Sequence, residues 1–101
     1  MDSEVKGNFM LRIEHQVMDF ATWKQAFDND PANRRQGGVV RYRVNRLINN
    51  PNYVVIDLEF ETIERLESFL ALLQKIWPKV EGKIIDSPKA HSFAIVEAGK
   101  F

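Results

Sequence analysis

The sequence predicts an α+β domain in which two helices cover one face of a four-stranded antiparallel sheet. Apolar residues alternate with a period of two in four segments and recur with helical spacing in two others, in the order strand, helix, strand, strand, helix, strand. The 101 residues, 45% of them hydrophobic, are enough for one such domain. The absence of cysteine excludes disulfides, thiolate metal ligands and cysteine nucleophiles.

The first strand is predicted at residues 9–17. One of its faces is apolar apart from a histidine and carries Phe9, Leu11, Ile13, His15 and Val17. A helix follows, because Asp19 suits the N-cap position, where a carboxylate accepts hydrogen bonds from backbone N–H groups. The apolar stripe of this helix consists of Phe20, Trp23 and Phe27. Asp30-Pro31 predicts a break and then a short helical turn that ends at Gly37-Gly38.

The next two strands are predicted at residues 39–47 and 53–60, joined as a hairpin by the turn-forming residues Asn49-Asn50-Pro51-Asn52. The second strand of this hairpin has one apolar face, made of Val54, Ile56, Leu58 and Phe60. On the first strand we expect three apolar residues on the same side of the sheet, namely Val40, Tyr42 and Val44. The opposite side then carries Val39, Arg41 and Arg43.

Thr62 suits the N-cap of a second helix. The apolar stripe of that helix contains Leu66, Phe69, Leu70, Leu73 and Trp77. Pro78 is expected to end it, and residues 79–89 are expected to form a connecting loop. The last strand is predicted at residues 90–97, with His91, Phe93 and Ile95 on the apolar face.

This order of elements is the ferredoxin-like βαββαβ pattern, in which right-handed crossovers place both helices on one face of the sheet. The domain is expected to occupy residues 9–97, between a flexible N-terminal segment at 1–8 and a C-terminal tail at 98–101. The sequence contains neither the apolar core of a signal peptide nor an apolar run long enough to span a membrane. A cytoplasmic protein with no membrane partner is therefore expected.

Two helices on one side leave the other face of the sheet open. One interpretation is a solvated surface, which antiparallel sheets commonly have. The other is self-association, in which a two-fold axis sets each arginine against an acid of the second copy. The residues expected at such an interface are Met10, Arg12, Glu14, Arg41, Arg43, Val55, Asp57 and Glu59.

Several stretches resemble the dimeric α+β barrel superfamily, which includes antibiotic-biosynthesis-type monooxygenases and muconolactone isomerases. The resemblance extends over residues 9–97 and is carried by residues 15–24, 27–28, 34–35, 42–44, 50–55, 58–61 and 69–70. It implies a homodimer whose two sheets pack face to face, with a cavity between sheet and helices in each copy. The monooxygenases commonly carry a tryptophan in the third strand, and a haem-degrading branch uses a helix histidine. This sequence has neither at the matching places.

The two histidines are the leading candidates for chemistry. Pairing Phe9 with Glu97 would set His15 opposite His91 at one end of the cavity, where an imidazole can act as general acid or base. The alternative is that both are strand-end residues with hydrogen-bonded tips. No spacing of metal ligands is present, so neither a metal nor a cofactor is expected.

Aromatic side chains are candidates for binding a small hydrophobic or aromatic ligand. A flat molecule could stack on Trp23, Phe27 and Tyr42, and Trp77 could close the far side of the cavity. The alternative for these residues is ordinary core packing, which is what aromatic residues at helical spacing usually do.

Two hypotheses for function follow. The first is a cofactor-independent enzyme of monooxygenase, isomerase or cyclase type, or a binder, that takes a small aromatic or polyketide-like molecule in the cavity. The second is a non-catalytic homodimeric module for ligand binding or interaction. Nucleic-acid binding is disfavoured, because basic and acidic residues number 14 each and the aromatic signatures of RNA-binding strands are missing.

Overall fold

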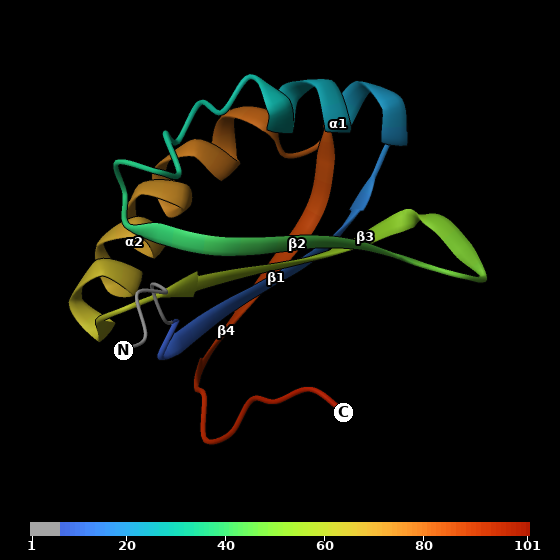
Figure 1. Ribbon diagram of the computed structural model, residues 1–101. Coiled ribbons are helices and arrows are strands. Elements are labelled where there is room, and N and C mark those ends of the chain that lie inside the picture. Colours follow the sequence, from blue (N-terminus) through green and yellow to red (C-terminus); the bar gives the residue numbers. More distant parts are fainter. Residues whose placement is uncertain (1–6) are drawn as a thin grey trace.

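The computed structural model describes residues 7–101 and contains the six predicted elements in order. They are β1 (Phe9–Val17), α1 (Phe20–Asp28), β2 (Val39–Leu47), β3 (Asn50–Phe60), α2 (Ile63–Val80) and β4 (Ile85–Ala94). The strands form one antiparallel sheet with the order β2-β3-β1-β4, and both helices lie over the same face of it (Figure 1). The predicted ferredoxin-like fold is confirmed. Most of the expected N-terminal segment, residues 1–6, lies outside the described residues.

The core lies between the helices and the two central strands. Alternate residues of β1 and β3 are buried because the helices cover only one face, and they include Leu11, Ile13, Val54, Ile56, Leu58 and Phe60. From α2, Leu66 and Phe69 complete this core, and the ring of Phe69 lies 5.7 Å from that of Phe60. Removal of this apolar surface from water is the main stabilising term of so small a domain.

Both predicted N-caps are confirmed. The carboxylate of Asp19 accepts hydrogen bonds from the backbone N–H of Thr22 at 2.9 Å and from its hydroxyl at 2.8 Å. The hydroxyl of Thr62 accepts from the N–H of Arg65 at 3.2 Å. Each cap partners an N–H group that would otherwise lack an acceptor in the first turn.

The segment between α1 and β2 differs in part from the prediction. Helix α1 ends before Asp30-Pro31, as expected, but residues 31–37 form successive turns rather than a helical turn. Asp30 and Asn33 adopt positive φ angles of 54° and 52°. Short polar side chains tolerate this left-handed backbone, which interrupts a continuous helix.

The predicted end of α2 at Pro78 is wrong, because the helix continues to Val80. Proline removes one backbone donor, but this position lies in the last turn and the carbonyl four residues earlier belongs to the exposed Gln74. The helix then closes with the N–H of Glu81 donating to the carbonyl of Trp77 at 2.8 Å. Among residues 7–101, no helix is both long and apolar enough to cross a membrane.

The predicted range of the last strand is also wrong. Strand β4 begins at Ile85, inside the expected loop, and ends at Ala94. Phe9 pairs with Ala94 instead of Glu97, a shift of three residues. Because strand faces alternate, an odd shift moves each side chain to the other face. His91 and Phe93 therefore lie opposite Arg12 and Met10, on the open face rather than the apolar one.

Two smaller corrections concern the β2–β3 hairpin. Leu47 pairs with Asn50, so the turn is formed by residues 48 and 49 and β3 starts three residues earlier than predicted. Val39 pairs with Phe60 on the covered face rather than on the open one. A register shift between Val39 and Arg41 changes the phase of the strand at that point.

Candidate functional site

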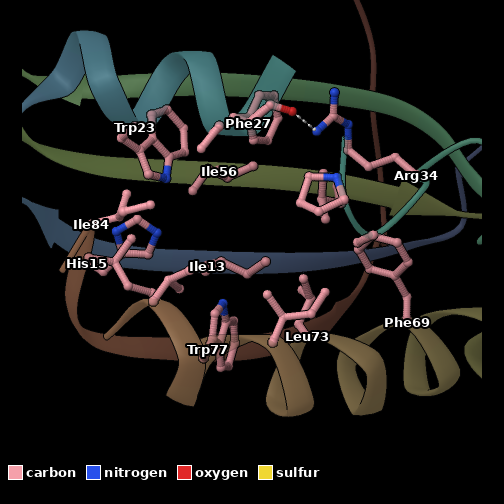
Figure 2. Close-up of a pocket in the computed structure, with 17 residues that line it drawn as sticks. Ile13, His15, Trp23, Phe27, Arg34, Ile56, Phe69, Leu73, Trp77 and Ile84 are labelled. Atoms are coloured by element: carbon pink, nitrogen blue, oxygen red, sulfur yellow. Dashed lines mark hydrogen bonds between the residues drawn. The ribbon is translucent and has the colours of Figure 1, made fainter. Parts of the chain in front are cut away.

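A cavity of about 130 Å³ lies between the sheet and the two helices (Figure 2). β1, β3, both helices and the start of β4 contribute to its walls. The walls are largely aliphatic and include Ile13, Ile56, Leu58, Leu73, Ile76 and Ile84. Apolar cavities of about this volume hold one aromatic ring.

His15 is the buried titratable side chain of this cavity. Its alternate position on β1 directs it to the covered face, where it is 4% exposed. The Nδ1 atom lies 3.2 Å from the backbone oxygen of Gln16. A carbonyl can only accept, so this contact assigns the ring hydrogen to Nδ1 and leaves Nε2 with a lone pair. Burial lowers the pKa of His15 below its ordinary value, which favours this neutral form at pH 7.

A row of aromatic rings runs from His15 along one wall. The indole of Trp23 stands edge-on to the imidazole, at 5.9 Å between centroids and 66° between planes. The ring of Phe27 is stacked on Trp23 at 5.1 Å, and Tyr42 follows at 6.0 Å from Phe27. The first helix places Trp23 and Phe27 on its inner side, because they belong to the stripe that faces the sheet.

Trp77 from α2 closes the opposite wall (Figure 2). The structure thus places three of the four candidate aromatic residues, Trp23, Phe27 and Trp77, around the cavity. Tyr42 lies outside it: the side chain is on the helix side of the sheet, but it is 56% exposed and does not line the cavity.

The two histidines do not meet. His15 faces the cavity, whereas His91 lies opposite Arg12 on the other face of the sheet and is exposed. The expected acid–base pair of histidines is therefore wrong, and the shifted register of β4 is the reason. His15 alone remains as a candidate proton acceptor in the cavity.

Arg34 lines the cavity at the end away from His15 (Figure 2). Its guanidinium lies 3.8 Å above the ring of Phe27 and donates to the carbonyl of that residue at 2.8 Å. It also lies 3.5 Å from a carboxylate oxygen of Asp30. Asp30 supplies an opposite charge beside the guanidinium, and the three contacts hold the side chain over the aromatic row.

The sequence prediction missed Arg34, Ile84 and Ile85 as cavity residues. Ile84 and Ile85 fall in the connecting loop predicted at residues 79–89, although an adjacent apolar pair is itself a signal for burial. Arg34 falls in the short helical turn predicted after Asp30-Pro31, and only the turns that form there instead bring it over Phe27. Among residues 7–101, no group of three His, Asp or Glu side chains is placed to hold a metal ion.

The open face carries the eight residues predicted for an interface. Cross-strand pairs set Met10 beside Glu59 and Glu14 beside Val55, and Arg41 and Arg43 beside Glu59 and Asp57. Arg12 binds Asp57 through two nitrogens, Nε at 2.8 Å and an Nη at 3.1 Å. The hydrogen bonding to Asp57 raises the pKa of Arg12 above its ordinary value. Glu14 accepts from the hydroxyl of Tyr53 at 2.7 Å, so several polar groups of the face are already held in place.

Solved structures of other proteins share this architecture. A dimeric ferredoxin-like protein from an uncultured marine organism has 9% identity and a TM-score of 0.71, over 95% of this chain and 94% of that one. A candidate antibiotic biosynthesis monooxygenase from Deinococcus radiodurans has 14% identity and a TM-score of 0.73, over 92% of this chain and 97% of that one. The chain has the ferredoxin-like fold of these proteins.

A third structure with this ferredoxin-like fold is SnoaB from Streptomyces nogalater, a cofactor-independent oxygenase. It shows 14% identity and a TM-score of 0.71, over 92% of this chain and 97% of SnoaB. No protein-family model matches the sequence, and a search of curated proteins finds no match. At these identities the likeness establishes the fold and leaves the activity to be argued from the site.

Proposed function

We propose that the cavity binds a small, flat, largely apolar ligand and that His15 accepts a proton from it without a bound cofactor. The position of Nε2 carries this proposal. The Gln16 carbonyl accepts a hydrogen bond from Nδ1, so the lone pair of the neutral ring is on Nε2. That nitrogen belongs to a buried side chain that lines an apolar cavity. A histidine whose pKa lies below neutrality is unprotonated at pH 7 and ready to act as a general base.

The size of the cavity narrows the class of ligand. About 130 Å³ suits one aromatic ring rather than a fused polyketide, so a single-ring aromatic molecule is the preferred ligand. SnoaB, a cofactor-independent oxygenase, has the same fold, which supports a reaction that needs no bound cofactor. The reaction class that fits is cofactor-independent proton transfer, of the kind that starts an isomerisation, a cyclisation or an oxygenation.

Binding and turnover of single-ring phenols, quinols and aromatic acids by the wild-type protein test this function. His15→Gln should abolish turnover while binding changes little, because glutamine cannot take up the proton at neutral pH. His91→Gln is the matched control and should retain activity, since His91 lies on the other face of the sheet. Binding without turnover would favour the non-catalytic module. No binding by any member of the panel would contradict the proposal.

We also propose that the open face joins two copies of the chain. Met10, Val55 and Phe93 supply apolar surface at its centre and edge, and the Arg12–Asp57 pair is preorganised within it. Among residues 7–101, Arg41 and Arg43 form no ion pair, so both are available to pair with acidic side chains of a second copy. Two proteins of the same fold are described as dimeric, which supports this assembly.

Light scattering at micromolar concentration tests the assembly. The expected mass is twice 11.8 kDa. Arg43→Glu should shift the protein toward monomer, because it sets like charges across the interface. Lys75→Glu makes the same charge change on the exposed side of α2 and should leave the mass unchanged. A wild-type monomer would contradict this part of the proposal.

A further inference from the structure

Two indole N–H groups lack an acceptor in the cavity. Trp23 comes from α1 and Trp77 from α2, and the nitrogen-bearing edges of both rings are turned toward the interior in Figure 2. Among residues 7–101, neither nitrogen makes a hydrogen bond. An indole N–H can only donate, and buried tryptophans usually find a partner for it. The pair therefore suits an acceptor that comes from a ligand.

These groups are open to such a ligand. Within the described part of the chain, no enclosed side-chain nitrogen or oxygen lacks a hydrogen-bond partner. Trp23 is only 5% exposed and its nitrogen has no partner, so that atom must border space that at least a water molecule can reach, and Trp23 lines the cavity. His15 is likewise buried and its Nε2 atom has no hydrogen-bond partner among the described residues, so this atom also borders accessible space. One acceptor and two donors thus border a cavity whose remaining walls are largely aliphatic.

We infer that Trp23 and Trp77 together stabilise a ligand oxygen that becomes negatively charged when His15 takes up a proton. This inference rests on the proposed function. The O–H bond of a phenol, or the acidic C–H bond of an enolisable cyclic ketone, breaks and the Nε2–H bond forms. The electron pair stays on the ligand as phenolate or enolate, and its oxygen accepts from both indole N–H groups. Atoms and charge balance without an oxidant or reductant.

The physical advantage lies in donors that are fixed before charge develops. In a cavity with few polar groups, hydrogen bonds to an oxygen anion are much stronger than in water. The Gln16 carbonyl holds the Nδ1 hydrogen throughout, so it also stabilises the imidazolium that forms. Arg34 is poorly placed for this task, because it is already engaged by Phe27 and Asp30. A ligand that enters neutral and becomes anionic fits this arrangement better than a carboxylate.

Two probes of similar size separate the inference from simple cavity binding. Nitrobenzene has no acidic proton, whereas 4-nitrophenol becomes a yellow phenolate when it loses one. At a pH one unit below the pKa of dissolved 4-nitrophenol, the wild-type protein should bind it at least about tenfold more tightly than nitrobenzene and turn it yellow. Equal affinity without the phenolate colour would overturn the inference.

Substitutions that remove only the N–H group assign the effect to the two tryptophans. Trp23→Phe and Trp77→Phe should each reduce the preference for 4-nitrophenol by about tenfold and leave nitrobenzene affinity within about twofold. Phe27→Leu alters the same wall without touching a donor, so it should shift both affinities together. Trp77 is less buried than Trp23, so its variant provides the measurement even where Trp23→Phe folds poorly. An unchanged preference in Trp77→Phe would overturn the inference.

The outcomes keep the two proposals apart. If nitrobenzene binds but 4-nitrophenol shows no preference, the oxygen site is wrong and the ligand cavity stands. If neither probe binds, both the cavity function and the oxygen site are wrong. If the preference survives in both tryptophan variants and disappears in His15→Gln, the histidine acts alone.

Discussion

The imidazole of His15 stands edge-on to the indole of Trp23, with 5.9 Å between centroids and 66° between planes. Together with the 3.2 Å contact to the Gln16 carbonyl, this packing fixes the ring in one orientation. The Gln16 carbonyl therefore decides which nitrogen carries hydrogen, and the two neighbours together fix where the other nitrogen points. A solvated histidine would have neither constraint.

Burial of this neutral imidazole predicts a loss of stability in acid. Its pKa is lowered in the folded protein, whereas the unfolded chain protonates near pH 6.5. Above that pH the imidazole is neutral in both the folded and the unfolded state, so its contribution to the free energy of unfolding does not vary with pH. As the pH falls from there toward the folded pKa, only the unfolded state binds the proton. The free energy of unfolding then decreases by at most about 1.4 kcal/mol per pH unit.

Urea unfolding between pH 7.5 and pH 4.5 measures this effect. His15→Gln should flatten the profile in that range, because it removes the titrating group. His91→Gln should follow the wild type, since His91 is exposed on the opposite face. Arg34 is the charged side chain that lines the same cavity, and it is present in every variant compared. Identical slopes in wild type and His15→Gln would contradict the assignment of a buried neutral imidazole.

Filling the cavity should stabilise the protein while it removes ligand binding. Ala26 lines the cavity from α1, and Ala26→Leu adds aliphatic volume there. We expect the free energy of unfolding to rise by about 0.5–2 kcal/mol, as in other cavity-filling changes. Ala21→Leu is the control, because Ala21 is on the exposed side of the same helix. Calorimetry and nitrobenzene titration would measure both effects, and unchanged binding in Ala26→Leu would place the ligand elsewhere.

The central strands were predictable because one face of each is covered. Burial alternates without interruption along β3 from Val54 to Phe60, and a period of two encodes that alternation directly. Strand β4 is different, because it lies at the edge of the sheet and carries Pro88. Ser87 has a positive φ of 53°, and the register between β1 and β4 shifts nearby. The residues 86–88 therefore look like a turn in sequence while they belong to a strand.

The candidate site was predictable only where local spacing controls it. Trp23, Phe27 and Trp77 reach the cavity because the helical period alone assigns their faces. Whether His15 meets His91 depends on a pairing register between distant strands, which the sequence does not encode locally. Arg34 depends on turns with positive φ at Asp30 and Asn33, which side-chain periodicity cannot indicate. Long-range register and turn geometry were the missing information.

Close packing at Gly37 predicts that adding a single methyl group there lowers the free energy of unfolding. A Cβ at this position would lie 2.5 Å from Cδ1 of Phe69, a buried core residue of α2. Gly37→Ala must displace the ring or the turn, so we expect a loss of about 1–3 kcal/mol in the free energy of unfolding. Gly99→Ala is the control, because nothing lies within 4 Å of a Cβ there. Equal stability of both variants in urea would show that the turn and α2 are not in contact.

The coupling free energy between Arg12 and Asp57 should differ between the monomer and the dimer. Within one chain the side chain of Arg12 is 40% exposed, so solvent screens the pair. A double-mutant cycle with Arg12→Met and Asp57→Asn should give a coupling of less than about 1 kcal/mol at concentrations where the chain is monomeric. If the open face joins two copies, the pair becomes desolvated, and its coupling should increase at concentrations where the dimer prevails.

Lys24 and Asp28 supply the reference pair for this cycle. They form an exposed ion pair at 2.7 Å on α1, away from the open face. Their coupling should remain near 0.3–0.5 kcal/mol at every protein concentration, roughly the value of exposed helical pairs. A coupling between Arg12 and Asp57 that is equally insensitive to concentration would indicate that the open face of the sheet stays in water.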